Sequence, residues 1–398
     1  MRPRSTFVCF MDVSGGHGGM TNYDVLTCEA LAQAGLAVAL ATSDEIALAH
    51  ELFDIWPVFH SIFRGSPVSR GLRYVAGLVT VVWRCWRRRR AYQEVILHNN
   101  WSIVPPADLI FVLCLRLLGI TCVSTVHDVR PYISRWGGRA MTPFFYRMHH
   151  ALVVHTHAAE QDLRELLATS APTVSLVPLP SFGKPYLSGI GVTRDAARRA
   201  VNLPSAAPIV LFFGLVKHVK GLGVLIDALP LIRQVVPDAL LVIVGEPWHD
   251  PVARYEDAIV TRGLNDAVIR RWGPVDEATL TFHFRAANVV ALPYLRASQS
   301  AVCLTAYALE RPVVATRAGG LPEQVVEGET GYLVTVDDPQ ELAQALSKML
   351  RDPGRADEMG RMGRRWMNER HGLEAVAAGF TSAYGAGRVH GSRPGNGV

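Results

Sequence analysis

The stretch that decides the fold is APIVLFFGLVKHVKGLGVLIDAL, residues 207–229. An apolar run of strand length ends at Gly214, and apolar residues then recur at helical spacing. The members of this helical stripe are Leu222, Leu225, Ile226 and Leu229. A wholly apolar strand that leads into a helix is typical of a parallel sheet buried on both faces. This stretch therefore predicts an α/β fold.

The same alternation extends in both directions along the 398 residues. Further apolar runs of strand length lie at 7–11, 36–42, 94–99, 121–128, 151–156, 239–246, 268–273, 288–294 and 312–316. A stretch after residue 170 is rich in Pro, Ser and Gly and interrupts the pattern, which indicates a domain junction. We therefore expect two doubly wound parallel-sheet, Rossmann-like domains. The predicted parts are domain 1–183, linker 184–206, domain 207–365, a helix 366–384 that packs back on the first domain, and a disordered tail 385–398.

Composition limits the class of protein. The chain is 49% hydrophobic and 19% charged, which favours a compact globular protein over disorder. A net charge of +5 is too small to indicate nucleic-acid binding. The six cysteines are scattered without a metal-ligand spacing, which indicates reduced thiols and a cytoplasmic protein. We expect neither a signal peptide nor a membrane-spanning helix.

Three strand-to-helix loops carry residues suited to a phosphate ligand, and ligands of open parallel sheets bind at such loops. The loop SGGHGGMTNYD, residues 14–24, has four glycines before a helix. Lys217 and Lys220 provide two cations after the strand that ends at Gly214. The third loop leads into a helix with Ser298, Ser300 and small residues at its start. For the first two loops a tight turn and a solvated lysine pair are the competing structural interpretations.

These motifs closely resemble those of the retaining glycosyltransferases of family 4. The resemblance continues through HDVRPY (127–132), LVIVGE (241–246), GPVDE (273–277) and SQSAVCLTAYALERPVVATRAGGLPE (298–323), in the family's order and spacing. It covers nearly the whole chain. It implies the GT-B fold, in which two Rossmann-like domains face each other across a cleft, with the donor in the second and the acceptor in the first.

The resemblance also implies roles for individual residues. Lys220 matches the diphosphate-binding lysine, and Lys217 replaces a basic residue that most members carry at position 215, where this chain has a leucine. Gly19, with its neighbour Gly18, matches the glycine near the donor phosphate, and His127 matches the histidine beside the transferred sugar. His127, Lys220 and Lys217 are thus the predicted catalytic residues. The predicted donor-binding residues are Gly18, Gly19, Gly214, Glu246, Pro274, Val275, Ser298, Ser300, Ala301, Val302 and Thr305.

One departure from the family pattern concerns two glutamates, eight residues apart, that many members use for the donor sugar and the ribose. Ala297 and Thr305 occupy these positions here. A branch of the family has S-Q-S-G at this place, and Ala301 replaces even that glycine. Recognition of the ribose by a carboxylate is therefore in doubt.

Three further residues are candidates on the acceptor side. His17 lies in the glycine loop, and Asp128 and Arg130 follow His127. A solvated loop histidine and a structural ion pair are the alternatives to contacts with acceptor.

The stretch 68–90 combines apolar residues at helical spacing with a basic end, RCWRRRR. Tryptophans beside arginines fit a helix that lies on an anionic membrane surface and brings the enzyme to a lipid-linked acceptor. An ordinary core-facing helix with a solvated basic end is the alternative. The membrane interpretation predicts a peripheral protein on the inner face of the plasma membrane.

Together these features predict a retaining transferase that moves a sugar from a nucleoside-diphosphate sugar to the hydroxyl of a sugar or lipid-linked acceptor, in bacterial polysaccharide or glycolipid assembly. We expect no cofactor and no metal. The alternatives are a catalytically degenerate subunit that binds a nucleotide sugar or a partner, and a sugar phosphorylase or synthase of the same fold.

Overall fold

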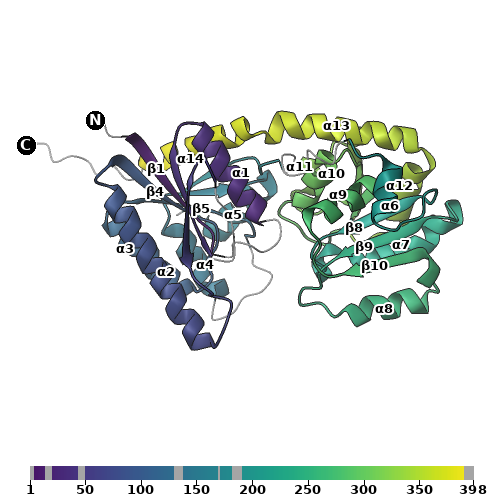
Figure 1. Cartoon of the computed structure of the whole chain (residues 1–398), viewed down its shortest axis with the longest axis horizontal. Helices are drawn as coiled ribbons and strands as arrows, with labels where there is room; N and C mark the ends of the chain where they lie inside the picture. The colour runs from purple at the N-terminus through teal and green to yellow at the C-terminus, as the bar shows by residue number, and fades with distance from the viewer. Residues whose placement is uncertain are drawn as a thin grey trace, which may run out of the picture. The chain divides into compact units, whose positions relative to one another are not determined.

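The computed structural model describes residues 4–13, 20–43, 50–129, 138–168, 171–181 and 191–389. The chain forms two compact units (Figure 1). Unit 1 comprises Met1–Pro180 with His371–Val398, and unit 2 comprises Ser181–Arg370. Each unit has its own sheet and its own cluster of buried apolar residues.

Unit 1 is built on a seven-stranded parallel sheet with the order β3-β2-β1-β4-β5-β6-β7. Helices α1 and α14 pack together beside the sheet, and α2 and α3 form a second contacting pair. The strands are β1 (Arg4–Met11), β2 (Ala37–Ser43), β3 (Asp54–Phe59), β4 (Tyr92–Asn99), β5 (Thr121–Thr125), β6 (Ala151–Val154) and β7 (Thr173–Leu176). The helices are α1 (Met20–Gln33), α2 (Pro67–Arg88), α3 (Pro105–Leu117), α4 (Gly138–Arg147), α5 (His157–Leu167) and α14 (Leu373–Val389).

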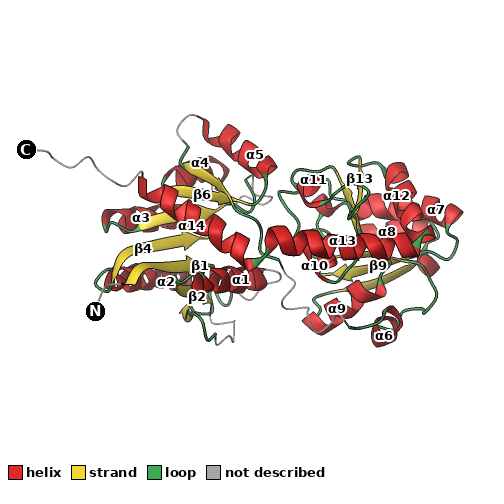
Figure 2. Ribbon diagram, turned by 90° about the horizontal axis from the view of Figure 1, so that it is seen from above, coloured by secondary structure: helices red, strands yellow, loops and turns green. Residues whose placement is uncertain are grey.

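Unit 2 has a six-stranded parallel sheet with the order β10-β9-β8-β11-β12-β13. Its strands are β8 (Ile209–Phe213), β9 (Leu240–Gly245), β10 (Val268–Trp272), β11 (Val289–Leu292), β12 (Val313–Thr316) and β13 (Gly331–Val334). Its helices are α6 (Arg194–Ala200), α7 (Leu222–Val235), α8 (Val252–Thr261), α9 (Glu277–Ala286), α10 (Ala301–Ala308), α11 (Leu321–Gln324), α12 (Pro339–Arg351) and most of α13 (Pro353–His371), with short 3-10 turns η3 (His218–Lys220) and η4 (Asn265–Ala267). Figure 2 shows the helices around each sheet.

The apolar runs form the strands because both of their faces are buried. In β8 the first four residues, Ile209–Phe212, are buried, and β11 and β12 are buried along their whole length. This is the burial expected of a parallel sheet with helices on both faces. The α/β class and the two parallel sheets predicted from the sequence are confirmed.

Three strands lie outside the predicted set. β3 contains Pro57, which lowers strand propensity but is tolerated because β3 is an edge strand. β7 is short, only partly buried and lies at the Pro/Ser-rich junction, and β13 follows a glycine turn. None of these segments has the long apolar run that marks the other strands.

Two segments differ from the predicted domain boundaries. Residues 194–200, placed in the linker, form α6, which packs against α9 within unit 2. Residues 385–389, placed in the disordered tail, continue helix α14, because its apolar face packs on α1 and on β5 to β7 of unit 1. Residues 390–398 lie outside the described residues.

Among the described residues, no helix combines the length and the apolar character needed to cross a membrane.

Candidate active site

The strand order of unit 2 creates one topological switch point, between β8 and β11. The chain proceeds from β8 to β9 and β10 on one side, and from β11 to β12 and β13 on the other. The loops 214–221 and 293–300 therefore leave neighbouring parallel strands at the same edge of the sheet. Ligands of open α/β sheets bind outside the carboxyl ends of the strands at such a point.

The two loops are tied together by backbone contacts. The Leu295 N–H donates a hydrogen bond to the Val219 carbonyl at 2.8 Å. Gly221 has φ +69°, and a Cβ atom built on it would lie 1.8 Å from the Pro293 carbonyl oxygen. Only glycine fits this position, because a side chain would meet the backbone of the neighbouring loop. The position of Lys220, one residue earlier, is thereby fixed relative to the end of β11.

Both predicted lysines lie beside aromatic rings. The Lys220 ammonium is 3.7 Å from the centroid of the Tyr294 ring, directly after β11, and the Lys217 ammonium is 5.8 Å from the Trp248 ring, after β9. Both lysines are half-buried. A cation over an aromatic face is stabilised by the ring quadrupole. The rings therefore hold two positive charges at the carboxyl edge of the sheet, where a diphosphate would bind.

Gly214 lies where β8, β9 and α10 come close together. Its φ is +112°, and a Cβ atom built on Gly245 would lie 1.8 Å from the Gly214 carbonyl oxygen. A Cβ on Gly214 itself would contact a methyl group of Val302 at 3.5 Å. The structure thus brings two predicted donor residues, Gly214 and Val302, next to each other.

The start of α10 is held by a buried cap. The Ser300 hydroxyl accepts a hydrogen bond from the Cys303 N–H at 3.2 Å, and the Ser300 N–H donates to Gln324 Oε1 at 2.7 Å. Ser300 is buried. The structure therefore gives its hydroxyl an N-cap contact. Ser298, Ala301 and Val302 are half-buried at the same helix end, and a phosphate contact from this turn stays a prediction.

The two positions that depart from the family pattern are both buried. The Thr305 hydroxyl donates to the Ala301 carbonyl, four residues earlier, at 3.0 Å. The Ala297 carbonyl accepts from the Gly320 N–H at 3.3 Å, and a Cβ atom on Gly319 would lie 1.8 Å from the same oxygen. The Thr305 hydroxyl proton is thus used within the helix, so only the oxygen lone pairs remain for a ribose contact.

The remaining predicted donor residues follow β9 and β10. Glu246 is exposed, and its carbonyl accepts a hydrogen bond from the Val216 N–H at 2.8 Å. Pro274 is exposed and Val275 is half-buried in the loop after β10. These three residues lie on the β9 and β10 side of the switch point.

In unit 1, His127 follows β5 and lies among aromatic rings. It stacks on Trp101 at 5.0 Å between ring centroids, and it forms a T-shaped contact with Tyr23 at 4.7 Å. Burial lowers the pKa of His127 well below its ordinary value, and the neighbouring His155 and His98 lower it further. The imidazole is therefore neutral at pH 7.

The other unit 1 predictions are covered only in part. Asp128 is half-buried after His127. His17, Gly18, Gly19 and Arg130 lie outside the described residues.

Several residues of these two sites were missed by sequence reasoning. Tyr294 and Trp248 were not singled out because their contacts with the lysines join different loops. In unit 1 the aromatic neighbours of His127 come from α1 and from the loops after β4 and β6. Their signal in the sequence is the position directly after a predicted strand, in HNNW (98–101) and VVHT (153–156).

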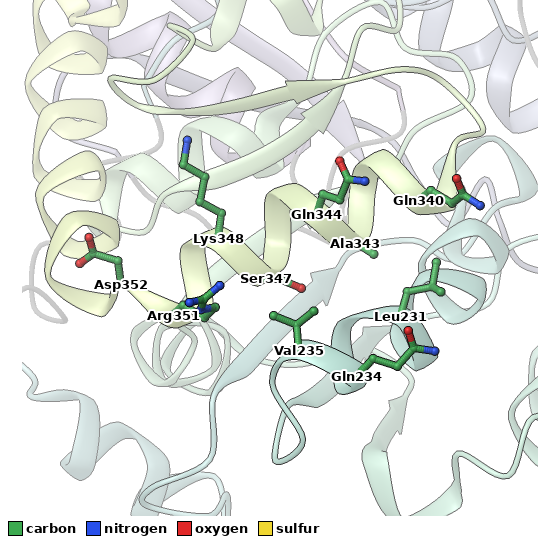
Figure 3. Close-up of a pocket in the computed structure, with 10 residues that line it drawn as sticks. All are labelled: Leu231, Gln234, Val235, Gln340, Ala343, Gln344, Ser347, Lys348, Arg351 and Asp352. Carbon is green, nitrogen blue, oxygen red and sulfur yellow. The ribbon is translucent and has the colours of Figure 1, made fainter.

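A separate pocket of 690 Å³ lies between α7 and α12 of unit 2 (Figure 3). Its lining residues are Leu231, Gln234, Val235, Gln340, Ala343, Gln344, Ser347, Lys348, Arg351 and Asp352. None of them is a predicted site residue, and the pocket is formed along the helices rather than by the loops at the switch point. We therefore place the candidate site at the strand ends.

Comparisons with known proteins agree on one family. Residues 207–352 match the family model described as Glycosyl transferases group 1. A D-inositol 3-phosphate glycosyltransferase of Corynebacterium urealyticum is 33% identical to the chain over 362 residues, which cover 85% of the chain and 84% of that relative.

Two solved structures share the fold. The chain resembles the sucrose-phosphate synthase of Thermosynechococcus elongatus with a TM-score of 0.73 and 22% identity, over 97% of this chain and 100% of that one. It resembles Anabaena Alr3699/HepE in complex with UDP-glucose with a TM-score of 0.71 and 17% identity, over 96% of this chain and 99% of that one. At these identities the likeness shows the fold.

Proposed function

The chain belongs to the glycosyl transferases of group 1 and has the GT-B fold, and from that premise we propose that it transfers a sugar from a nucleoside-diphosphate sugar to an acceptor hydroxyl, with retention of configuration. The enzyme is a glycosyltransferase. The donor, the retaining course and the acceptor are the parts that we propose.

The observation that carries the proposal is the placement of Lys220. Its ammonium lies at the switch point beside Tyr294, with Lys217 on the same loop. During transfer the bond between the sugar and the diphosphate breaks and negative charge develops on the leaving phosphate oxygen. Fixed cations at that place stabilise the transition state more than the ground state. The α10 N-terminus, with Ala301 and Val302, would add N–H donors.

We expect no resident cofactor or metal for this step, as the family resemblance implies. The two lysines would provide the positive charge. The similar Anabaena protein has been solved with UDP-glucose, a nucleotide sugar. The Corynebacterium relative is named for inositol 3-phosphate, which is not a nucleotide.

The donor is tested by thermal unfolding with UDP-, GDP-, ADP- and TDP-sugars. A ligand at 100 times its dissociation constant adds about 2.7 kcal/mol to the free energy of unfolding. We expect one nucleotide to raise the unfolding temperature selectively in the wild type and to have little effect in Lys220→Ala. If none of the nucleotides changes it, the chain does not bind a donor, and the degenerate-subunit alternative raised by Ala297 and Thr305 gains support.

We also propose that unit 1 docks on an anionic membrane through α2. This helix has two apolar faces, of which one is buried in the core through Tyr74, Leu78 and Val81. The other face is exposed, and its residues recur every three or four positions: Val68, Leu72, Val75, Val79, Trp83 and Trp86. An ordinary core-facing helix does not require this second face, and an exposed apolar stripe of this length is typical of an interaction surface.

Charge and aromatic content favour a lipid surface as the partner. Arg87 lies over Trp83 at 4.8 Å and Arg90 over Trp86 at 5.2 Å, so basic groups flank the exposed tryptophans. The neighbouring α3 adds Ile110, Leu113 and Leu117, which are also exposed and share one face. Tryptophans and arginines around an apolar stripe fit the interface of an anionic bilayer. This contact would place a lipid-linked acceptor near unit 1, on the inner face of the plasma membrane.

Vesicle sedimentation tests the membrane proposal. Val79→Glu combined with Trp83→Glu should lower binding to phosphatidylglycerol vesicles at least tenfold, because two carboxylates enter the apolar interface and oppose the anionic headgroups. Val260→Glu on α8 is the matched control, because Val260 is 58% exposed and Val79 is 63% exposed. Equal vesicle binding by the wild type, the double variant and Val260→Glu would rule out this face as a membrane contact. If the double variant instead has a lower mass in solution than the wild type in the absence of lipid, the partner of this face is a second copy of the chain.

A further inference from the structure

Three neighbouring strands of unit 1 end beside nitrogen-containing rings. Trp101 follows β4, His127 follows β5 and His155 follows β6. The His127 and His155 ring centroids are 5.4 Å apart, and Trp101 stacks on His127 at 5.0 Å. Tyr23 of α1 forms T-shaped ring contacts with both imidazoles. The three rings therefore form one cluster at the carboxyl edge of the unit 1 sheet.

The hydrogen-bonding state of His155 is set by its backbone contact. His155 Nδ1 lies 2.8 Å from the Val177 carbonyl oxygen, and a carbonyl only accepts, so Nδ1 carries the proton. Burial lowers the pKa of His155 to about 4, although the bond to Val177 opposes this shift. At neutral pH the ring is therefore uncharged, and its Nε2 has a free lone pair that can only accept a hydrogen bond.

Three polar atoms of this cluster are unpaired in the part of the chain that the structure describes. His155 Nε2, His127 Nε2 and Trp101 Nε1 are each buried and have no hydrogen-bond partner among the described residues. An unpaired buried polar group costs about 1–3 kcal/mol, so a molecule that forms hydrogen bonds with these three atoms would be stabilised there. Asp24 and Asn100, which are hydrogen-bonded to each other at 2.9 Å, are also buried.

The chemistry of these atoms selects the kind of ligand. Trp101 Nε1 donates only, and His155 Nε2 accepts only. His155 Nε2 therefore requires a hydrogen-bond donor, which a hydroxyl group supplies, whereas a phosphate or carboxylate oxygen would meet the His155 lone pair with one of its own. The aromatic faces suit the apolar side of a sugar ring.

We propose that His155 is a second substrate-binding histidine, whose Nε2 accepts a hydrogen bond from a hydroxyl of the sugar or cyclitol ring bound beside His127 and Trp101. This inference rests on the proposed transferase function and concerns which hydroxyl-bearing ring unit 1 holds. The ring belongs either to the transferred sugar or to the acceptor, and the two sources are distinguished by the Michaelis constants.

Two substitutions distinguish the structural role of His155 Nδ1 from the proposed binding role of His155 Nε2. His155→Asn keeps an N–H near the Nδ1 position, which can still donate to Val177, but it has no group at Nε2. His155→Gln places an amide oxygen near Nε2 and loses the anchor. If Nε2 binds substrate, His155→Asn should keep the wild-type unfolding temperature but have a kcat/KM about tenfold lower. His155→Gln should unfold at a lower temperature, but below that temperature it should retain more activity than His155→Asn.

The KM values identify the source of the hydroxyl. A rise in KM for the nucleotide sugar assigns the contact to the transferred sugar, and a rise in KM for the acceptor assigns it to the acceptor ring. His149→Asn is the matched control. His149 Nδ1 lies 2.9 Å from the Phe145 carbonyl oxygen, and its Nε2 is also buried with no partner among the described residues. His149 differs from His155 in that it lies before β6, at the opposite edge of the sheet. Because Asn can keep the contact with Phe145 in the same way, that variant should retain the unfolding temperature and both KM values.

The inference about His155 is overturned if wild type and His155→Asn have the same kcat and the same two KM values, since a trapped water would then satisfy the ring. That result leaves the transferase function intact. The absence of turnover in the wild type with every nucleotide sugar would instead overturn the proposed function, and this inference with it.

Discussion

Lys220→Ala should lower kcat about 100- to 1,000-fold, which is the loss seen when one preorganised group that stabilises the transition state is removed. The ammonium of Lys220 lies at the switch point, 3.7 Å from the centroid of the Tyr294 ring. Without it, the charge that develops on the leaving diphosphate loses a charge-assisted contact worth about 1.5–3 kcal/mol or more. The measurement is the initial rate of nucleoside diphosphate release at saturating donor and acceptor.

The matched control is Lys348→Ala. Lys348 also lies over an aromatic ring, that of Tyr332 at 4.4 Å, but on α12 in the pocket away from the site. It should retain kcat within about twofold. Equal losses in the two variants would show that the lysine at the switch point has no special role, and full activity in Lys220→Ala would remove the mechanism proposed here.

Gly221→Ala should destabilise unit 2 by about 3 kcal/mol or prevent its folding. The left-handed backbone conformation costs a non-glycine residue about 1–2 kcal/mol, and the added methyl would lie 1.8 Å from the Pro293 carbonyl oxygen. Relief of this clash requires the loop with Lys220 to move away from the end of β11. Calorimetric unfolding should therefore show a lower transition temperature for the unit that contains residues 181–370.

Gly223→Ala is the control for this steric argument. Gly223 lies two positions later, inside α7, and a Cβ atom built there meets nothing within 4 Å. Alanine in a helix is favoured over glycine by about 0.5–1 kcal/mol, so this variant should be as stable as the wild type or more stable. If Gly221→Ala has the same transition temperature as Gly223→Ala, the close approach of the two loops is contradicted.

Sequence alone was sufficient where a residue's role follows from its place after a strand. The run that ends at Gly214 predicted β8, and the parallel order of the sheet then brought the loop with Lys217 and Lys220 to the switch point. His127 was predicted from the family resemblance, and the structure places it after β5. These positions depend on local periodicity and on the general topology of parallel sheets.

Sequence reasoning does not reveal contacts between distant segments. A serine at the start of a helix has the same pattern whether it caps the helix or binds a phosphate, and the contact of Ser300 with Cys303 and Gln324 appears only in the fold. Tyr294 and His155 were overlooked because the partners that give them a role, Lys220 and His127, belong to other loops. The apolar stripe of α2 with Trp83 and Trp86 was recognised in the sequence, but its exposure became evident only when burial identified another face, with Tyr74, Leu78 and Val81, as the one in the core.

The most direct test of the account is the product analysis of one reaction. Wild-type protein is incubated with the nucleotide sugar that stabilises it and with phosphatidylglycerol vesicles that contain a hydroxyl-bearing lipid acceptor, and the products are quantified by mass spectrometry and the anomer by NMR. The account predicts nucleoside diphosphate and glycoside in equal amounts, a retained anomer, and loss of both products in Lys220→Ala. Release of a sugar phosphate, or product formation that is equal in wild type and Lys220→Ala, would contradict it.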